Sequence, residues 1–183
     1  MVKDILQRKY GFSLLELMVV IGIIGLLATI VLPRLTNKGP WARLNTFAQQ
    51  MANTIRKVGD TALIEHTTYR IVIEPQKHTI SAEYITKKLD SNGKAIWQAK
   101  KFMAPKIPFL WDKNIVLENI FINGKDELQK HEITTKIYIY ISHTGIGQPT
   151  IINSTDRATR KKLSLKINPF TLDSTTSHEY QKT

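Results

Sequence analysis

The longest apolar stretch of the chain lies close to its start. From Phe12 to Leu32, a run of 21 residues, Glu16 is the only charged position. An α-helix needs about 20 predominantly apolar residues to cross a bilayer. The pattern therefore predicts a membrane-spanning helix over residues 12–35. Basic residues on one flank of such a span hold that flank in the cytoplasm, and three of them precede this run: Lys3, Arg8 and Lys9.

A second stretch has the spacing of an amphipathic helix. Apolar residues recur at steps of three and four from Trp41 to Ala62, with polar residues between them. These steps place one apolar stripe along a helix. We expect residues 36–66 to continue the first helix and to pack through the stripe on a folded domain. Gly39-Pro40 indicates a kink or a brief break, since proline cannot donate the helix hydrogen bond.

Beyond Thr67 the apolar positions change toward a period of two, which predicts strands. Residues 103–114 contain two prolines and are expected to form a loop, and the Ser- and Thr-rich residues 171–183 are expected to form a flexible tail. The β-rich domain should therefore span residues 67–170. Its predicted strands are 69–73, 79–85, 95–102, 115–122, 136–142, 150–153 and 162–167.

Together these segments predict an α+β fold. A long N-terminal helix, half in the membrane and half amphipathic, packs on an antiparallel β-sheet domain. If the helix runs from Phe12 to about His66, it is roughly 80 Å long at ~1.5 Å per residue.

The composition narrows the chemistry of the chain. It has no cysteine, which excludes disulfides, thiolate metal sites and cysteine nucleophiles. Its formal net charge is +11. Such a surplus suits nucleic acid, acidic lipid head groups or an acidic partner protein, but the lysines are mostly scattered, which equally fits an ordinary solvated surface.

Glu16 needs an explanation, because a carboxylate inside a membrane span costs on the order of 2.5–3.5 kcal/mol. If the chain is cut between Gly11 and Phe12, Phe12 gains a positive α-amino group and Glu16 lies in the first helical turn. The helix dipole favours an acid at that position. An amine on a neighbouring subunit could then pair with Glu16 and set the register of stacked subunits. The alternative is a plain single-pass anchor with an accidental glutamate.

The sequence Gly11-Phe12-Ser13-Leu14-Leu15-Glu16, between a basic leader and an apolar span, resembles the class III signal of type IV pilins and type II secretion pseudopilins. The resemblance implies that the prepilin peptidase cuts after Gly11 and removes residues 1–11. It further implies that Phe12 is then N-methylated and that Glu16 recruits the subunit into a filament. The implied fold is ladle-shaped, with a single pass through the bacterial inner membrane and a globular domain in the periplasm.

The C-terminal half resembles the globular domain of H-type minor pseudopilins and FimT/FimU-like minor pilins, through its segments IYIYISHTGIGQPTIINS and KKLSLKINPFTLDS. Those proteins often end near a threonine-glycine turn, whereas residues 168–172 contain no glycine. The cysteines of many major pilins and the acidic calcium loop of the major pseudopilin are not found here. The resemblance therefore implies a minor subunit of the type II secretion pseudopilus, in or at the tip of a periplasmic filament that supports protein export.

The resemblance also implies a set of partners. They are the other major and minor pseudopilins, the prepilin peptidase, the inner-membrane assembly platform and membrane lipid. Two alternatives stay open: a minor type IV pilin that binds DNA during uptake, and one that primes a pilus for adhesion or motility.

Four basic residues are clustered near the C-terminus: Arg157, Arg160, Lys161 and Lys162. A loop with this charge could bind the phosphates of DNA or an acidic partner, with an affinity that falls as salt rises. It could equally be a solvated turn. Phe170 is the nearest aromatic residue in the sequence, so the sequence predicts no rings interleaved with the basic residues for base stacking.

We expect no cofactor, no metal and no catalytic activity. Gly145-Ile146-Gly147 lacks the further glycine of a dinucleotide loop, and no serine lies in a nucleophile elbow. Asn153-Ser154-Thr155 fits the glycosylation sequon, a triplet that is common by chance. The histidines lack metal-ligand spacing: His66, His78, His131, His143 and His178.

Overall fold

The first helix, α1 (Leu14–Thr36), begins with a side-chain cap. The backbone N–H of Glu16 donates to Ser13 Oγ at 3.1 Å, and the N–H of Leu17 donates to the Ser13 carbonyl at 3.1 Å. Serine followed three residues later by glutamate is the capping-box sequence that starts helices. Residues 14–36 therefore form a helix close to the predicted bounds.

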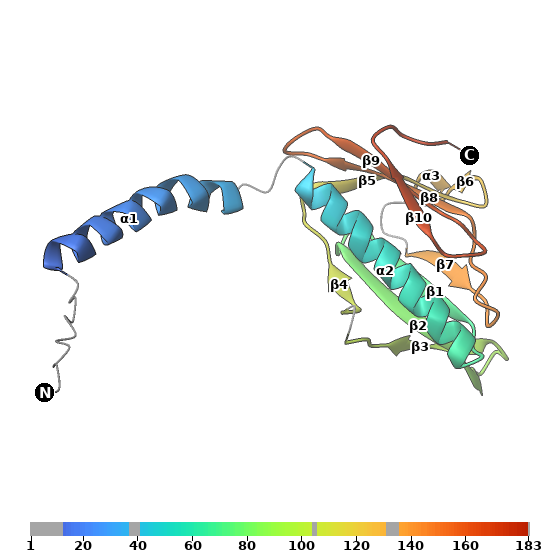
Figure 1. The fold of residues 1–183 in the computed structure, drawn as a ribbon. Coiled ribbons are helices and arrows are strands. Elements are labelled where there is room, and N and C mark those ends of the chain that lie inside the picture. The colour runs from blue at the N-terminus through green and yellow to red at the C-terminus, as the bar shows by residue number, and fades with distance from the viewer. Residues whose placement is uncertain (1–12, 37–40, 104–105, 131–135, 183) are drawn as a thin grey trace, which may run out of the picture. The chain divides into compact units, whose positions relative to one another are not determined.

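A computed structural model of the chain describes residues 13–36, 41–103, 106–130 and 136–182 (Figure 1). It divides into two compact units, Met1–Gly39 and Pro40–Thr183. The junction of the two predicted helix halves falls on residues 37–40, outside the described residues, so their continuity stays a prediction. Among the residues that are described, no helix is both long enough and apolar enough to cross a membrane.

The second helix, α2 (Ala42–Ile64), buries its apolar stripe as the spacing predicts. Leu44, Met51 and Val58 are fully buried, and the exposed positions are mostly polar. Thr54 and Thr61 also lie on the buried side. Each donates its hydroxyl to the carbonyl four residues earlier, which satisfies the polar atom inside the core.

The strands form two antiparallel sheets, within the antiparallel β-sheet domain that the sequence predicts. The first has the order β3-β2-β1-β7, with β4 paired to β2 beside β3. Its strands are β1 (Tyr69–Glu74), β2 (Thr79–Leu89), β3 (Ala95–Lys100), β4 (Phe109–Leu110) and β7 (Ile137–Ile141).

The second sheet has the order β10-β9-β8-β5-β6, with the short helix α3 (Glu127–Lys130) following β6. A register shift between Leu117 and Asn119 interrupts the β5–β8 pairing. Its strands are β5 (Ile115–Ile122), β6 (Lys125–Asp126), β8 (Thr150–Asp156), β9 (Lys162–Ile167) and β10 (Ser174–Ser177).

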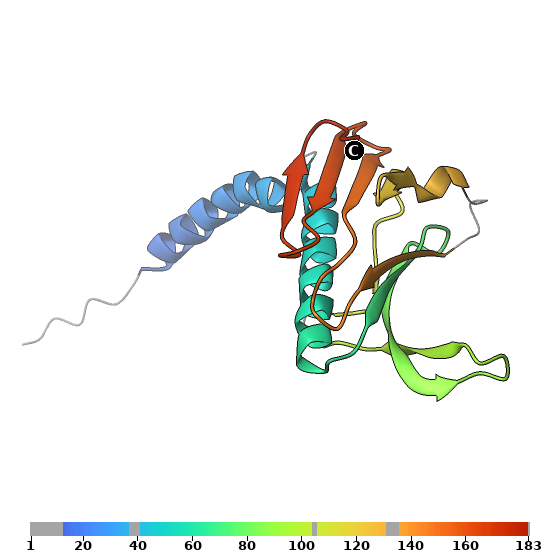
Figure 2. The same ribbon diagram turned by 90° about the vertical axis from the view of Figure 1, so that its right-hand side faces the viewer.

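Helix α2 connects the two sheets through one core. It contacts β1 and β7 of the first sheet and β8 and β9 of the second (Figure 2). Alternate residues of each strand face the helix, because side chains alternate between the two faces of a sheet. Most of these inward residues are isoleucine: Ile71 and Ile73 on β1, Ile137, Ile139 and Ile141 on β7, and Ile152 and Ile167 on β8 and β9.

Three short elements depart from the sequence predictions. Strand β4 lies inside the predicted loop 103–114, and β6 lies between the predicted strands 115–122 and 136–142. Each has only two residues, which are too few to show a period. Strand β10 lies inside the predicted flexible tail 171–183, and Ser174 to Ser177 pair with β9 from Ile167 to Ser164. Serine and threonine composition could not reveal this strand, because its pairing is made by the backbone.

The turn before β10 is fixed by Leu172. Its φ of +57° is unusual for a leucine. The side chain is 7% exposed and occupies the space beside Gly59 of α2 and Gly147. The tail is therefore docked on the domain by an apolar contact.

We expect Leu172→Ala to lower the free energy of unfolding by about 2–5 kcal/mol, the usual cost of truncating a buried leucine. Urea unfolding monitored by tryptophan fluorescence measures the change. Phe170→Ala is the matched control, because Phe170 is 75% exposed and exposed substitutions usually stay within about 0.5 kcal/mol. Equal stability of the two variants would mean that residues 171–183 are a tail after all.

Candidate functional site: the N-terminal motif and the β8–β9 hairpin

The residues of the predicted processing site are only partly described. Gly11 and Phe12 lie outside the described residues. Glu16 lies in the first turn of α1 and is exposed, as are its described neighbours Leu15 and Leu17. An exposed apolar helix with one acid near its start leaves its side chains free to contact other molecules.

The four predicted basic residues lie together on the β8–β9 hairpin, and all four are exposed. Backbone hydrogen bonds hold the turn: the N–H of Arg160 donates to the Asp156 carbonyl at 2.7 Å, and the N–H of Arg157 donates to the Asn114 carbonyl at 2.8 Å. In the described part of the chain, none of the four forms an ion pair. Their charges are therefore available to an anion.

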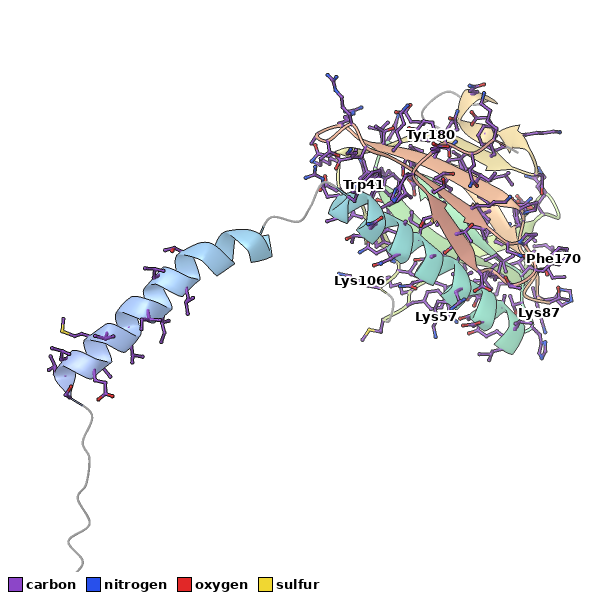
Figure 3. The ribbon with its side chains drawn as sticks, turned by 45° about the horizontal axis from the view of Figure 1, so that its top comes forward. Trp41, Lys57, Lys87, Lys106, Phe170 and Tyr180 are labelled. Atoms are coloured by element: carbon purple, nitrogen blue, oxygen red, sulfur yellow. The ribbon has the colours of Figure 1, made fainter. Side chains whose placement is uncertain are left out.

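Two aromatic rings lie beside this cluster, contrary to the sequence prediction. Lys161 Nζ lies 5.4 Å from the centre of the Trp41 ring, and Lys162 Nζ lies 4.9 Å from that of Tyr180. Figure 3 shows Trp41 and Tyr180 toward the same end of the domain and Phe170 near the other end. Phe170 is the aromatic residue nearest to the basic cluster in the sequence, but Trp41 and Tyr180 are the rings that lie beside it in the fold.

Trp41 and Tyr180 reach the hairpin from distant parts of the sequence. Trp41 immediately precedes α2, and its ring lies 4.1 Å from that of His178, centre to centre. Tyr180 contacts the hydroxyl of Thr155 on β8 through its own hydroxyl, and the Gln181 carbonyl accepts a hydrogen bond from Asn153 Nδ2 at 3.0 Å. The segment after β10 thus crosses β8 and carries its ring to Lys162.

Asn153 is 1% exposed, and its amide nitrogen is used in this contact. The side chain that the sequon would modify is therefore enclosed in the folded domain. The triplet is better explained as part of β8, whose Asn153 and Ser154 both lie in the interior.

An ion pair between the partly exposed Arg43 and the buried Asp156 joins the hairpin to α2. Arg43 Nε donates to Asp156 Oδ2 at 2.9 Å and its Nη2 donates to Oδ1 at 3.2 Å, while the Asp156 side chain is completely buried. The N–H of Ala158 also donates to Asp156 Oδ1, at 2.9 Å. Arg43 lies in the first turn of α2, which has no acid of its own, so this pair connects the end of β8 to the start of the helix.

The pKa of Asp156 reflects these contacts. Burial acts to raise the pKa, but the hydrogen bonds from Arg43 and the backbone outweigh it, and the pKa lies below its ordinary value. The carboxylate therefore stays ionised at neutral pH, where it neutralises Arg43 rather than the four exposed basic residues.

The comparisons with known proteins agree on both parts of the chain. Residues 6–32 match the prokaryotic N-terminal methylation motif. The fold is similar to that of the minor pseudopilin EpsH from the Type 2 Secretion System of Vibrio cholerae, with a TM-score of 0.51 and 9% sequence identity over 74% of this chain and 96% of that chain. The chain thus combines an N-terminal methylation motif with a domain whose fold is similar to that of a minor pseudopilin. A search of curated proteins gives no match in sequence.

The predicted α+β class and the predicted resemblance are both confirmed. The roles of Gly11, Phe12, Glu16 and the basic cluster stay predictions. The described residues contain no group of three or more histidine, aspartate or glutamate side chains that could hold a metal ion.

We expect Asp156→Asn to lower the free energy of unfolding at pH 7 by about 1.5–3 kcal/mol, because a charged hydrogen-bonded pair is lost. A carboxylate with a depressed pKa stabilises the fold above its unfolded pKa of about 3.9, and this contribution fades as pH falls through the folded pKa. The difference from wild type should therefore narrow below about pH 4. Urea unfolding over a pH series measures it.

Asp60→Asn is the matched control, because Asp60 is exposed on the same helix. It should leave stability nearly unchanged at every pH. If the difference in free energy of unfolding between wild type and Asp156→Asn stayed constant from pH 7 to pH 3, the lowered pKa of Asp156 would be contradicted.

Proposed function

We propose that this pilin-like chain is a minor subunit of a type II secretion pseudopilus, a structural component and not an enzyme. The observation that carries the proposal is the combination of an N-terminal methylation motif with a domain whose fold is similar to that of a minor pseudopilin. Each half alone is compatible with several pilin-like systems; together they favour this one.

In this proposal the N-terminal segment has three successive roles. Residues 1–11 are removed by the prepilin peptidase, and Phe12 becomes the methylated N-terminus. Residues 12–35 anchor the subunit in the inner membrane and then pack among the helices of the other pseudopilins. Glu16 pairs with the N-terminal amine of a neighbouring subunit, which offsets the cost of a carboxylate in an apolar environment.

The exposed surface of α1 supports this assembly role. Its side chains from Leu14 to Leu27 are exposed in the isolated chain, and a contiguous apolar surface of this kind marks a contact with protein or membrane. The domain from Pro40 onward has its own core, so it does not need α1 to bury its apolar residues.

The test is the intact mass and N-terminal sequence of membrane-extracted protein, produced with and without prepilin peptidase. We expect a chain that starts at methylated Phe12 only when the peptidase is present. A chain that starts at Met1 in both samples would reduce the protein to a simple anchored domain.

Glu16→Leu separates processing from assembly in the same experiment. It keeps Gly11 and Phe12, so cleavage should proceed, but cross-linking to other pseudopilins in the membrane should fall by at least about tenfold because the ion pair is missing. Undiminished cross-linking would remove Glu16 from the assembly contact.

A second candidate function, single-stranded DNA binding by a minor type IV pilin, is favoured by the β8–β9 hairpin. Lysines that track a phosphate backbone and rings that stack on bases are the two components of single-strand binding sites. Here Lys161 and Lys162 lie over Trp41 and Tyr180, with Arg157 and Arg160 next to them in sequence.

If the hairpin binds single-stranded DNA, the affinity for DNA should fall as salt rises, and this salt dependence should come from the lysines of the hairpin rather than from lysines elsewhere. Replacing Lys161 and Lys162 together by glutamine should reduce the slope of log K against log salt by about 1.4, because each phosphate contact to a single strand contributes about 0.7. Fluorescence anisotropy with a labelled oligothymidine at several salt concentrations measures the slope.

Replacing Lys87 and Lys106 by glutamine is the control, since both are exposed, lie away from the hairpin (Figure 3) and give the same net charge. Equal effects of the two double variants would indicate a diffuse attraction to the +11 chain. No binding at low salt would exclude the DNA-uptake candidate and leave the pseudopilin proposal untouched.

A further inference from the structure

Strand β3 has an open edge. It ends the order β3-β2-β1-β7 of the first sheet, and no described strand pairs with its far side (Figure 1). An open edge presents unpaired N–H and C=O groups to any extended segment that approaches.

The backbone groups at this edge can be identified. The N–H of Ile85 on β2 donates to the Thr68 carbonyl at 3.0 Å, so the polar groups of Ile85 face β1. Its partner on β3 is Trp97. In an antiparallel pair of this kind both residues point their polar groups away from each other. Trp97, and by alternation Ala99, therefore direct N–H and C=O toward the open edge.

The middle of this edge lacks the features that usually block pairing, while lysines lie at its two ends and β2 has a register shift between Ile85 and Leu89. Residues 95–99 read Ala-Ile-Trp-Gln-Ala, without a proline or a charge. By contrast, the outer edge of β7 is covered, because the N–H of Tyr140 donates to Gln148 Oε1 at 2.9 Å and Ile141 bridges to Gly147. Edge β10 is only four residues long and polar. Compared with the edges of β7 and β10, the edge of β3 is therefore better suited to accept a strand.

A cluster of contacting side chains lies on the sheet beside this edge. The Arg70 guanidinium lies 4.2 Å from the centre of the Trp97 ring and 4.3 Å from that of Tyr138, and its Nε donates to Glu83 Oε2 at 2.7 Å. Trp97 also meets Tyr140 edge-on at 5.8 Å. Tryptophan, tyrosine and arginine are the residues that dominate binding energy at interfaces.

The positive charges at the two ends of β3 favour a negatively charged partner strand. Lys94 and Lys101 are exposed at the two ends of β3, while the Lys100 ammonium is held 2.7 Å from Glu65 Oε1. If two copies of this chain paired about Trp97, Lys94 of each copy would lie opposite Lys100 and close to Lys101 of the other. Like charges placed opposite each other destabilise strand pairing.

We propose that β3 is a docking edge for an extended segment of another protein that carries acidic residues at both ends. The segment adds as a further strand, receives hydrogen bonds from Trp97 and Ala99, and places its acids near Lys94 and Lys101. This goes beyond the proposed function and does not depend on Glu16 or on the β8–β9 hairpin.

The probe is a nine-residue peptide of alternating threonine and valine with two glutamates at each end, added to the full-length protein in detergent. Amide hydrogen exchange reports the pairing. With about 1 mM peptide we expect exchange at Trp97 and Ala99 to slow by at least about tenfold. Gln98, whose N–H already faces β2, should change little. A peptide with lysines in place of the glutamates should have less than about a twofold effect.

Ala99→Pro tests the edge itself. Proline removes the N–H that faces the open edge and leaves the ladder to β2 in place, so the acidic peptide should no longer slow exchange at Trp97. Ala99→Thr keeps the N–H and should respond as wild type does. Unchanged protection of Gln98 and Lys100 in the proline variant confirms that the β2–β3 hairpin still forms.

Three results would overturn the proposal. The first is no slowing with the acidic peptide, and the second is equal slowing with the lysine peptide. The third is protection of Trp97 and Ala99 without peptide that grows with protein concentration, which would assign the edge to a second copy of the chain.

Discussion

The burial of one face of α2 between two sheets is the constraint on which the domain depends. Both sheets take part in burying the stripe from Leu44 to Ala62, since α2 contacts strands of both. A fully buried leucine, isoleucine or methionine contributes about 1.5–3 kcal/mol, whereas an exposed ion pair such as Arg56–Asp173 contributes about 0–1 kcal/mol. Apolar burial therefore decides the arrangement, and the polar contacts refine it.

The position of the basic hairpin follows from that arrangement. Because β8 and β9 pack on α2, the turn between them reaches the start of the helix, where Arg43 and Trp41 lie. The Arg43–Asp156 pair is the one polar contact there that cannot be lost without leaving a charge unpaired inside the protein. It neutralises the inner charges, so the four outer ones keep their full attraction for an anion. The packing of the hairpin on α2 thus keeps the Arg43–Asp156 pair on the inner side and leaves the four basic residues of the turn exposed.

The sequence predicts the helices and strands whose apolar residues recur at a regular spacing and misses those without such a spacing. The stripe of α2 and seven strands could be located from spacing, because each is long enough for alternate positions to be sorted by burial. Strands β4 and β6 have two residues each, and β10 is built of serine and threonine, so hydrophobic spacing carries no information about them. The contacts of Lys161 with Trp41 and of Lys162 with Tyr180 join distant positions; only the packing of α2 and the path after β10 bring them together. Their pairing could not be inferred from neighbouring residues.

The specific role of a protein with this fold must lie in its exposed residues rather than in the fold. At 9% identity with EpsH the core still produces a similar domain, as expected when apolar character and approximate size suffice to specify a core. What differs between proteins of this fold is then the surface. In this chain the surface carries the basic β8–β9 hairpin, which is flanked by aromatic rings, and the open edge of β3, which lies between lysines. Both are positive, and they lie on different sheets. In the roles proposed above, the N-terminal helix serves assembly, while these two separate surfaces of the domain bind negatively charged partners.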